Sequence, residues 1–459
     1  MKLTFCWAAK IVTGSCYLIE TNDKKFLIDC GMFQWSKEIM KLNYDPFLFD
    51  PKEIDFVLLT HAHIDHCGLI PKLYKNWFSG KIYTTSATID LCGIMLLDSA
   101  QIQKKNIEQE NKRRLRISQE PRLPIYTEDE AKECMELFSP VEYRKNYKIT
   151  DVIEVRFQDA GHILGSAHIE LFVTENWTTK KLVFSGDIWQ RNTPIVQDPT
   201  LIEEADYLFI ESTYGDRRHE NTTSKEDLLV KYISETYDKW GKLMIPSFSV
   251  ERTQELLYFL NIIIKKWKFP AEKIFLDSPL SIKATEIFKH HTEYFDKDAT
   301  EKYPHPFDFP ELKCTESFED SKKINDYTLP CIIIAGNGMC TAGRITHHIK
   351  HGIWDKRNTL LFIGYQAEWT LGRFILEWAK KVKLMGIEIN VNAEIALINW
   401  FSGHADCDQL MKRAKWFTKA PTKTFIVHGE WKAQIAFKER LETIGFTCEI
   451  PNFKEHIEL

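Results

Sequence analysis

The chain has 459 residues, 44% of them hydrophobic, and a formal net charge of −5 at pH 7. This composition excludes a disordered chain, and the length exceeds what one core usually serves, so we expect two or three globular domains. The slightly acidic balance excludes a uniformly basic nucleic-acid binder, so any basic surface must be local.

No window of the sequence approaches the roughly 18 apolar residues of a membrane helix, and its first residues do not resemble a signal peptide. The 11 cysteines are scattered, odd in number, and include no C-x-x-C pair. Such scatter is typical of reduced thiols rather than of a disulfide framework. We therefore expect a cytoplasmic protein with no membrane partner.

Short strands separated by turns are predicted in the first half of the chain. FLIDCG, at 26–31, runs into a glycine turn, and the apolar run 56–59 precedes a histidine-rich segment. VIEVRF, at 152–157, alternates apolar and polar residues, and KLVFSGD and DYLFIEST are apolar runs that end in small polar residues.

A helix is predicted from Ala87 to about Gln119, and it carries the charged stretch KRRLR at 112–116. A run of charges on a helix is more often a solvated face than a binding surface, and we favour that interpretation. A basic rim for RNA is the alternative.

After Tyr214 an apolar run is followed four times by a loop and a helical pattern, as in KLMIPSFSVERTQELLYFL and TLLFIGYQAEWTLGRFILEWAKK. Repeated strand–loop–helix units predict an α/β domain with a parallel sheet. Short strands then return, and no low-complexity linker separates the parts. We expect an α/β domain over 212–380, inserted into an outer domain made of 1–211 and 381–459.

Four potential metal ligands lie within the six residues HAHIDH. His61 and His63 are two residues apart in a turn after a strand, so both imidazoles can bind one ion. Asp65 and His66 can then face a second ion. Imidazole nitrogens suit zinc, and manganese is the alternative where oxygen ligands dominate.

A metal ion that keeps a water for catalysis needs about three protein ligands, so two ions need more ligands than HAHIDH contains. Three further residues follow predicted strands, namely His162, Asp187 and His428. A carboxylate such as Asp187 can bridge two ions. Each residue alone is a weak signal, but the set predicts a two-metal site.

The sequence resembles the metallo-β-lactamase-fold hydrolases, and within them the β-CASP branch of RNA-processing nucleases. It is most similar to the single-chain prokaryotic members and is also similar to the cleavage subunit of the eukaryotic mRNA 3′-end machinery. The resemblance covers nearly the whole chain in motifs such as LIDCGMFQ, LTHAHIDHCGLIP, AGHILGSA, FSGDIWQ, ESTYGD, GMCTAGR, FSGHAD and VHGE.

The resemblance implies an αββα sandwich with an inserted Rossmann-like parallel domain, and two zinc ions, with manganese as the alternative metal. The first ion would be held by His61, His63 and His162, the second by Asp65, His66 and His428, and Asp187 would bridge them. Asp29 in LIDCG matches a family aspartate that orients the ligand loop.

Glu211 and His404 match motifs that mark this branch, and with Asp65 they are the expected catalytic residues. A phosphodiester is slow to react because negative charge builds on its oxygens, and two metals can lower the pKa of a shared water and clamp the phosphate. We expect the bridging hydroxide to attack phosphorus while His404, oriented by Glu211, protonates the leaving 3′ oxygen. Single-stranded RNA would then be cut to 5′-phosphate and 3′-hydroxyl ends.

Phosphate groups of the RNA are expected at loop–helix junctions of the inserted domain, because helix N-termini and arginines attract phosphate. The resemblance adds Ser402 of FSGHAD, which matches a family position near the scissile or 5′-terminal phosphate. The candidates are Ser247, Arg252, Arg344, Arg373 and Ser402. The alternative is that the arginines only form local salt bridges.

Three residues depart from the family pattern. Trp7, Lys10 and Trp369 stand where glycines are usual, and such bulky groups could narrow the path of the substrate. They bear on the substrate path more than on the metal ligands.

Several histidines are not assigned to the metal site. His168 is expected in the core or at a strand edge. His347, His348 and His351 lie on a predicted helix, where surface histidines are common.

Other functions are weighed against a metal-dependent ribonuclease. A thioester or lactone hydrolase is disfavoured by the four α/β units and FSGHAD, and a di-iron redox protein by His63 where that branch has glutamate. A catalytically inactive or partner-dependent RNA-processing scaffold is disfavoured because every ligand position is filled. DNA as substrate, endonuclease against 5′–3′ exonuclease action, a homodimer and a larger RNA-processing complex are left open.

Overall fold

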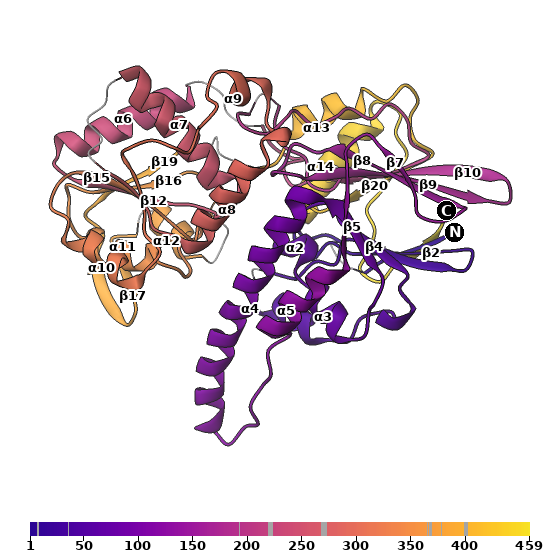
Figure 1. Ribbon diagram of the computed structural model, residues 1–459, viewed down its shortest axis with the longest axis horizontal. Helices are drawn as coiled ribbons and strands as arrows, with labels where there is room; N and C mark the ends of the chain where they lie inside the picture. The colour runs from indigo at the N-terminus through magenta and orange to yellow at the C-terminus, as the bar shows by residue number, and fades with distance from the viewer. Residues whose placement is uncertain are drawn as a thin grey trace. The chain divides into compact units, whose positions relative to one another are not determined.

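The computed structural model describes residues 1–6, 9–34, 36–191, 193–218, 224–267, 273–364, 366, 370–377, 379–398 and 403–459. The chain forms two compact units (Figure 1). We call Met1–Arg218 with His404–Leu459 the outer unit, and His219–Gly403 the inserted unit. Among the described residues, none of the helices combines the length and the hydropathy that a membrane crossing requires.

Two seven-stranded sheets form the centre of the outer unit. In the first, the strand order is β22 (His456–Glu458), β1 (Lys2–Phe5), β2 (Tyr17–Thr21), β3 (Lys24–Ile28), β4 (Phe56–Leu58), β5 (Lys81–Thr85) and β6 (Phe138–Val141). In the second it is β21 (Cys448–Glu449), β20 (Lys423–Val427), β11 (Tyr207–Glu211), β10 (Thr178–Phe184), β9 (Ala167–Glu175), β8 (Ile153–Asp159) and β7 (Asn146–Lys148).

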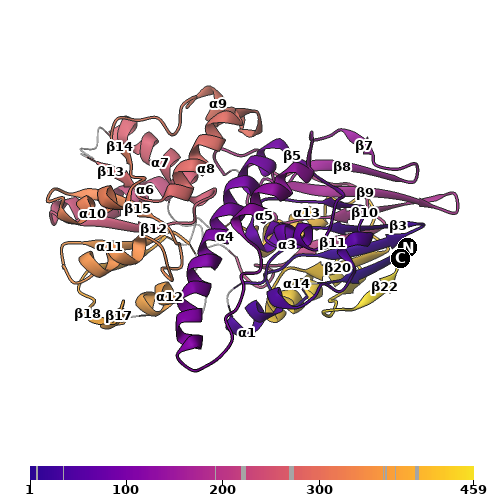
Figure 2. The same ribbon diagram turned by 60° about the horizontal axis from the view of Figure 1, so that its bottom comes forward.

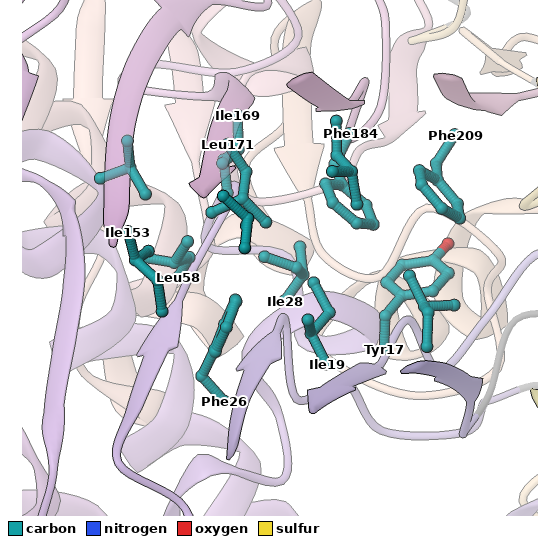
Figure 3. Packing of buried hydrophobic residues seen from close by; sticks show 14 of the residues in the cluster. Tyr17, Ile19, Phe26, Ile28, Leu58, Ile153, Ile169, Leu171, Phe184 and Phe209 are labelled. Atoms are coloured by element: carbon teal, nitrogen blue, oxygen red, sulfur yellow. The ribbon is translucent and has the colours of Figure 1, made fainter. Parts of the chain in front are cut away.

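The two sheets pack face to face around one hydrophobic core (Figure 3). Alternating residues of each strand point into it, as Ile153, Val155 and Phe157 do along β8. Phe209 stacks on Phe184 with ring centroids 4.3 Å apart and contributes to the same core. Residues from both ends of the chain take part, because β22 pairs with β1.

Helices cover the outer faces of both sheets, which confirms the predicted αββα sandwich. The helices are α1 (Lys37–Met40), α2 (Ile64–Cys67), α3 (Ile70–Lys75), α4 (Ser86–Leu115), α5 (Glu128–Glu133), α13 (Cys407–Ala414) and α14 (Trp431–Glu442). Helices α13 and α14 pack Leu410 and Phe437 against Ile210 and Ile426 of the second sheet. Helix α4 packs against β5 and β6 of the first sheet.

The inserted unit contains a six-stranded sheet in which every neighbouring pair is parallel, as predicted. The order is β14 (Leu312–Cys314), β13 (Ile274–Leu276), β15 (Cys331–Ala335), β12 (Lys242–Pro246), β16 (Thr359–Phe362) and β19 (Glu394–Leu397). One face carries α6 (Lys225–Asp238) and α7 (Arg252–Trp267), and the other carries α10 (Phe318–Asp326), α11 (Ile345–Gly352) and α12 (Leu371–Leu376) (Figure 1). The remaining elements are α8 (Pro279–His290), α9 (Lys297–Glu301) and the hairpin β17 (Lys381–Leu384) and β18 (Ile387–Asn390).

The inserted unit extends further along the chain than the expected end at residue 380. Val382 and Leu384 of the β17–β18 hairpin are buried in the same core as Leu360 and Phe362 of β16. Strand β19 then pairs with β16 as the edge of the parallel sheet. The chain returns to the outer unit only at His404, because this late segment buries its apolar residues in the inserted core.

A buried carboxylate connects three strands of the second sheet. Glu170 on β9 is 1% exposed and binds Arg156 of β8 through two hydrogen bonds of 2.6 and 2.9 Å. Glu170 also forms an ion pair with Lys181 of β10 at 2.6 Å and accepts a hydrogen bond from Gln158 of β8 at 2.7 Å. Burial alone would raise the pKa of Glu170, but these hydrogen bonds lower it to about 2.

We expect Glu170→Gln to lower the free energy of unfolding at neutral pH by about 3 kcal/mol, the linkage equivalent of this pKa shift. Because the folded pKa lies below the unfolded one, the stabilisation is complete above the unfolded pKa and disappears as the pH falls towards about 2. Denaturant titrations from about pH 7 to about pH 3 should therefore show the two proteins converging. Asp151→Asn, at a carboxylate with 97% exposure, is the control and should change little. A difference in the free energy of unfolding between wild type and Glu170→Gln that stays constant with pH would contradict a stabilising role for the Glu170 charge.

Candidate metal centre

The HAHIDH segment follows β4 and is held in place by the carboxylate of Asp29, which follows β3. Strands β3 and β4 are parallel neighbours, so their ends lie side by side. Asp29 Oδ1 accepts the backbone N–H of Thr60 at 2.8 Å, and Oδ2 accepts the Thr60 hydroxyl at 3.0 Å. Asp29 Oδ2 also lies 2.7 Å from His66 Nδ1. Because an ionised carboxylate only accepts, His66 carries a proton on Nδ1, and its Nε2 is available as a ligand.

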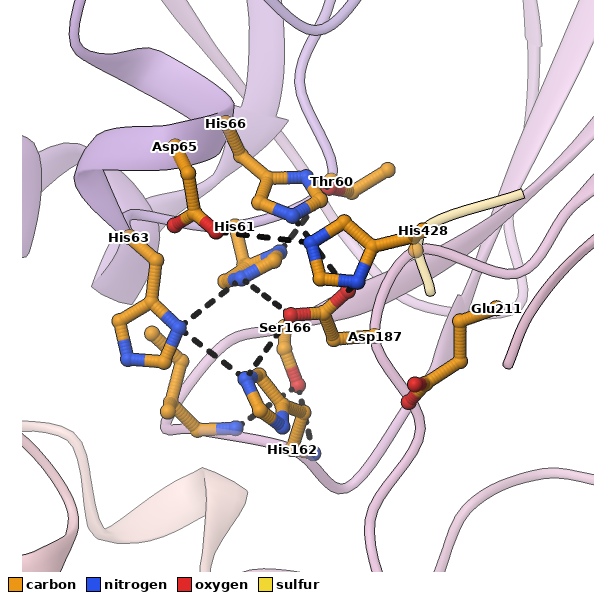
Figure 4. A network of polar contacts seen from close by, with 12 residues as sticks. Thr60, His61, His63, Asp65, His66, His162, Ser166, Asp187, Glu211 and His428 are labelled. Atoms are coloured by element: carbon orange, nitrogen blue, oxygen red, sulfur yellow. Dashed lines mark hydrogen bonds and ion pairs between the residues drawn. The ribbon is translucent and has the colours of Figure 1, made fainter. Parts of the chain in front are cut away.

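One group of ligand atoms is formed by His61, His63, His162 and Asp187 (Figure 4). His61 Nε2 and His162 Nε2 lie 3.1 and 3.0 Å from His63 Nδ1. The same two nitrogens lie 3.7 and 3.5 Å from Asp187 Oδ2. Ligands about 2.0–2.1 Å from a tetrahedral ion lie about 3.3 Å from one another, so these separations fit a metal such as zinc.

A second group is formed by Asp65, His66 and His428. His428, at φ 45° after β20, places its Nε2 3.4 Å from Asp65 Oδ2 and its Nδ1 3.4 Å from Asp187 Oδ1. His66 Nε2 also lies 3.4 Å from Asp187 Oδ1. The two oxygens of Asp187 thus face different groups (Figure 4), which is the arrangement of a bridging carboxylate.

Two buried ligand atoms that lack hydrogen bonds indicate that these residues fit divalent cations. His66 Nε2 and Asp187 Oδ1 are both buried and have no hydrogen-bond partner. A neutral His66 with its proton on Nδ1 would set two lone pairs against each other, which a cation between them relieves. Burial works to lower the pKa of His66, but Asp187 and Asp29 raise it well above its usual range, so without an ion a second proton would take the place of the cation.

Protonation states also suit metal binding at the first group. Burial lowers the pKa of His61 well below its usual range and lowers that of His63 to about 4. Burial works to raise the pKa of Asp187, but the charges of His428 and His66 hold it well below its usual range. Neutral imidazoles and an ionised carboxylate are the forms that bind metals.

His404 and Glu211 form a pair beside both ligand groups. Glu211 ends β11 and is fully buried, and its two oxygens lie 3.0 and 3.1 Å from His404 Nδ1. The same oxygens accept the backbone N–H groups of Ile188, at 2.6 Å, and Thr213, at 3.3 Å. The His404 ring centre lies 5.0 Å from that of His162. Although Glu211 also approaches the ligand atoms, its oxygens already hold these donors, so it orients His404.

Two residues that the sequence analysis missed fix the ligand loops. The Thr60 hydroxyl lies 3.0 Å from His61 Nδ1 while it bonds Asp29. The Ser166 hydroxyl accepts the backbone N–H groups of His162, at 2.9 Å, and Ile163, at 3.2 Å. Serine and threonine are common in loops, so their residue type does not reveal such a role in the sequence. The only sign of it was that Thr60 directly precedes HAHIDH and Ser166 directly follows AGHILG.

The residues expected to bind phosphate lie in the inserted unit, except Ser402, which is outside the described residues. Each arginine has a carboxylate partner: Arg252 with Glu255 at 3.2 Å, Arg344 with Asp277 at 2.7 Å and Arg373 with Glu377 at 2.5 Å. The Ser247 hydroxyl donates to the Phe248 carbonyl at 3.2 Å. Their contact with phosphate stays a prediction, and RNA would have to compete with these partners.

The expectation that His348 lies on the surface is wrong. His348 is 2% exposed, and its Nε2 lies 2.6 Å from Asp277 Oδ2, because its face of α11 packs against the end of β13. His168 is buried as expected, and its Nδ1 contacts the Ser185 carbonyl. Of the unusual bulky residues, Trp7 and Trp369 lie outside the described residues, and the ammonium of Lys10 lies over the Trp431 ring.

Three family models match the chain in succession. Residues 10–230 match the metallo-beta-lactamase superfamily, 253–375 match the Beta-Casp domain, and 388–451 match the Zn-dependent metallo-hydrolase RNA specificity domain. The order agrees with an outer unit interrupted by an inserted one.

Among curated relatives, Ribonuclease TTHA0252 of Thermus thermophilus is 34% identical over 460 residues, with 100% of both chains covered. The RNase J-like protein of Methanocaldococcus jannaschii is 34% identical over 98% of this chain and 97% of its own. Transcription termination factor FttA of the same organism is 32% identical over 97% of this chain and 69% of its own length.

A solved structure of a protein of unknown function from Enterococcus faecalis V583 covers 100% of this chain and 99% of its own, with a TM-score of 0.59. At 13% identity this likeness shows the fold alone. The domain models and the full-length relatives establish more: the chain belongs to the β-CASP branch of the metallo-β-lactamase superfamily, a branch of metal-dependent RNA-processing nucleases.

Proposed function

We propose that the protein is a dinuclear zinc-dependent ribonuclease that hydrolyses phosphodiester bonds of single-stranded RNA and leaves 5′-phosphate and 3′-hydroxyl ends. The observation that carries this proposal is Asp187, whose two oxygens face two separate groups of metal ligands. The full-length relative named a ribonuclease supports RNA as the substrate. Zinc suits the five imidazoles among the ligands, and manganese is the alternative.

Seven residues would hold the ions, namely His61, His63, Asp65, His66, His162, Asp187 and His428. When bound, two divalent ions supply the positive charge that a phosphodiester transition state needs and the acidity that makes water a nucleophile. Asp29 keeps His66 in one tautomer and one orientation through its 2.7 Å contact.

His404 would deliver a proton to the leaving 3′ oxygen. Its Nδ1 faces the Glu211 carboxylate, so a proton there would be held in place, and Nε2 is the nitrogen that would act on the substrate. The carboxylate also stabilises the charged imidazolium before transfer. A group held in this way serves as a general acid for a poor leaving group.

A catalytically inactive scaffold is the second candidate, and DNA is the second substrate. An inactive scaffold would not need a set of metal ligands, whereas all seven candidate side chains fall within the groups that could hold a metal ion. Both endonuclease and 5′–3′ exonuclease action are compatible with this proposal. They differ in whether the enzyme binds the 5′ end of the RNA. A cytoplasmic location, a homodimer and a larger RNA-processing complex remain predictions.

The mode of cleavage can be tested with one single-stranded RNA that carries a label at its 5′ end and either a 5′ monophosphate or a 5′ hydroxyl. The intact protein, zinc or manganese, and an Asp187→Ala control complete the assay, which is repeated with DNA. Labelled mononucleotide from the phosphorylated RNA alone would indicate an exonuclease, and internal fragments from both would indicate an endonuclease. No cleavage above the control would refute a stand-alone ribonuclease and favour the scaffold.

We expect His404→Ala to lower kcat by roughly 10²–10⁴-fold, the usual contribution of a general acid, while metal content is unchanged. The reason is that His404 contacts Glu211 and belongs to neither ligand group. Steady-state kinetics and elemental analysis of the same preparations measure both quantities. His456→Ala, at an exposed histidine of β22, is the control and should behave as wild type. Loss of metal from His404→Ala would contradict its assignment.

We expect two ions per wild-type chain, and Asp29→Asn should weaken metal affinity about 10–100-fold because it removes the acceptor that orients His66. Competition with a chelator, followed by elemental analysis, measures the affinity and the stoichiometry. Asp23→Asn, at an exposed aspartate in the β2–β3 turn, is the matched control. One ion per chain would refute the dinuclear site, and unchanged affinity would refute the role of Asp29.

A further inference from the structure

Helix α4 and the segment that follows it form an arm on the outer unit. The helix has 30 residues, from Ser86 to Leu115, and in Figures 1 and 2 its second half runs out beyond the rest of that unit, with the chain returning alongside it. We define the arm as residues 101–123. At about 1.5 Å per residue, its outer end is about 45 Å from the start of the helix.

The arm is an ordered structure, because its two sides are bonded to each other. Asn111 Nδ2 donates to the Arg122 carbonyl at 2.9 Å, and Arg122 N–H donates to Asn111 Oδ1 at 2.8 Å. Arg114 Nε donates to the Glu120 carbonyl at 2.7 Å. Ile107, 7% exposed, lies on the same helical face as Asn111 and Arg114, four and seven residues before them. The inner face of the helix is therefore occupied by the returning chain.

The opposite face of the helix presents a row of cations to solvent. Lys105, Lys112 and Arg116 are spaced seven and four residues apart, which places them on one face over about 16 Å. All three are exposed, and within the described part of the chain their side chains form no ion pair or hydrogen bond. Three other cations of the arm have carboxylate partners, since Lys104 pairs with Glu128, and Arg114 and Arg122 pair with Glu110. Arg113 is exposed as well but points to one side of this row.

The net charge of the arm is positive, whereas that of the whole chain is negative. Residues 101–123 contain seven lysines and arginines against three glutamates, whereas the whole chain carries −5. A row of unpaired cations on a rigid support has the charge to complement a polyanion, and RNA is the polyanion that this family acts on. The exposure of these cations agrees with the solvated helix face favoured from the sequence, and their alignment opposite the returning chain is the additional feature that would suit a phosphate backbone.

The start of helix α4, which leads to the arm, is hydrogen-bonded to the loop that carries His162. The hydroxyls of Thr85 and Thr88, at the start of α4, donate to the Gly165 carbonyl at 2.7 and 2.9 Å. Gly165 belongs to the loop that carries His162. The helix thus runs from a ligand loop to Lys105 over about 30 Å and to Arg116 over about 45 Å.

We propose that the face formed by Lys105, Lys112 and Arg116 binds the phosphate backbone of the RNA substrate at a distance from the metal centre. The proposal rests on the proposed ribonuclease function. It makes the arm a site for long RNA, because a very short RNA at the metals cannot reach it. The contacts are with phosphates, so they are independent of sequence and weaken with salt.

The test compares wild type with a triple variant, Lys105→Gln, Lys112→Gln and Arg116→Gln. Its control is Lys412→Gln, Lys415→Gln and Lys419→Gln, which removes the same charge from exposed positions in and after α13. Cleavage of RNAs of about 40 and about 4 nucleotides is followed at several salt concentrations. For the long RNA, the arm variant should show KM raised about 10-fold, unchanged kcat, and a salt slope smaller by about 2, since each lost contact on a single strand is worth about 0.7.

The short RNA and the control variant should behave as wild type does. Equal KM and equal salt slope in wild type and the arm variant would overturn the proposal, as would an equal loss on the short RNA. Binding of the long RNA by the Asp187→Ala chain, with and without the arm substitutions, tests the arm separately from catalysis. If wild type cleaves neither RNA, the proposed function fails, while the arm is still judged by that binding difference.

A protein partner or a second copy is the other occupant that the arm would fit, because Leu115, Ile117 and Leu123 are 62%, 65% and 79% exposed. The double variant Ile117→Ser with Leu123→Ser distinguishes RNA binding from binding of a protein partner or a second copy. The RNA proposal expects this double variant to keep wild-type KM for long RNA and wild-type size in solution. A change in oligomeric state in either arm variant, without a change in RNA affinity, would overturn the proposal.

Discussion

The contact between Asp29 and the loop after β4 is the interaction on which the site depends. Asp29 follows β3, the loop follows β4, and the parallel pairing of these strands brings the carboxylate under Thr60 and His66. Without it, the His66 ring could rotate or take the other tautomer, and Nε2 would no longer face Asp187. The position of a single carboxylate, set by strand pairing, therefore fixes how His66 contributes to the second ligand group.

The metal centre is a costly arrangement in a protein interior. It places buried imidazoles and carboxylates at 3.0–3.7 Å from one another, with His66 Nε2 and Asp187 Oδ1 lacking hydrogen bonds. Such groups destabilise a fold unless an ion pairs with them. The rigidity that holds them comes from the core between the two sheets, where Phe184, Phe209 and their neighbours are almost fully buried. Metal binding and folding should consequently support each other.

In the functions that we propose, the reaction and the contact with distant phosphates would lie apart on the outer unit. The ligands and the His404–Glu211 pair lie at strand ends, where loops from both sheets meet. The cations of the arm lie on one face of a long helix, away from the ligands, and only the start of that helix is hydrogen-bonded to Gly165 in the loop that carries His162. A general phosphate contact far from the reacting bond adds affinity without restricting the sequence that is cut.

Some features of this protein were determined by the sequence alone. HAHIDH is a local pattern, so its ligands were evident, and the strand–loop–helix units showed a parallel sheet because periodicity is also local. Other features depended on tertiary contacts. His348 reads as a surface residue because its partner Asp277 is distant in sequence, and residues 381–397 read as outer-domain strands because their apolar side chains do not say which core buries them. The positions of His162, Asp187 and His428 after predicted strands, together with the family resemblance, predicted that they join HAHIDH, but only the fold decided which of their atoms face which group. The fold also decided that the face with Lys105, Lys112 and Arg116 lies opposite the returning chain, because strand pairing and packing bring together side chains far apart in sequence.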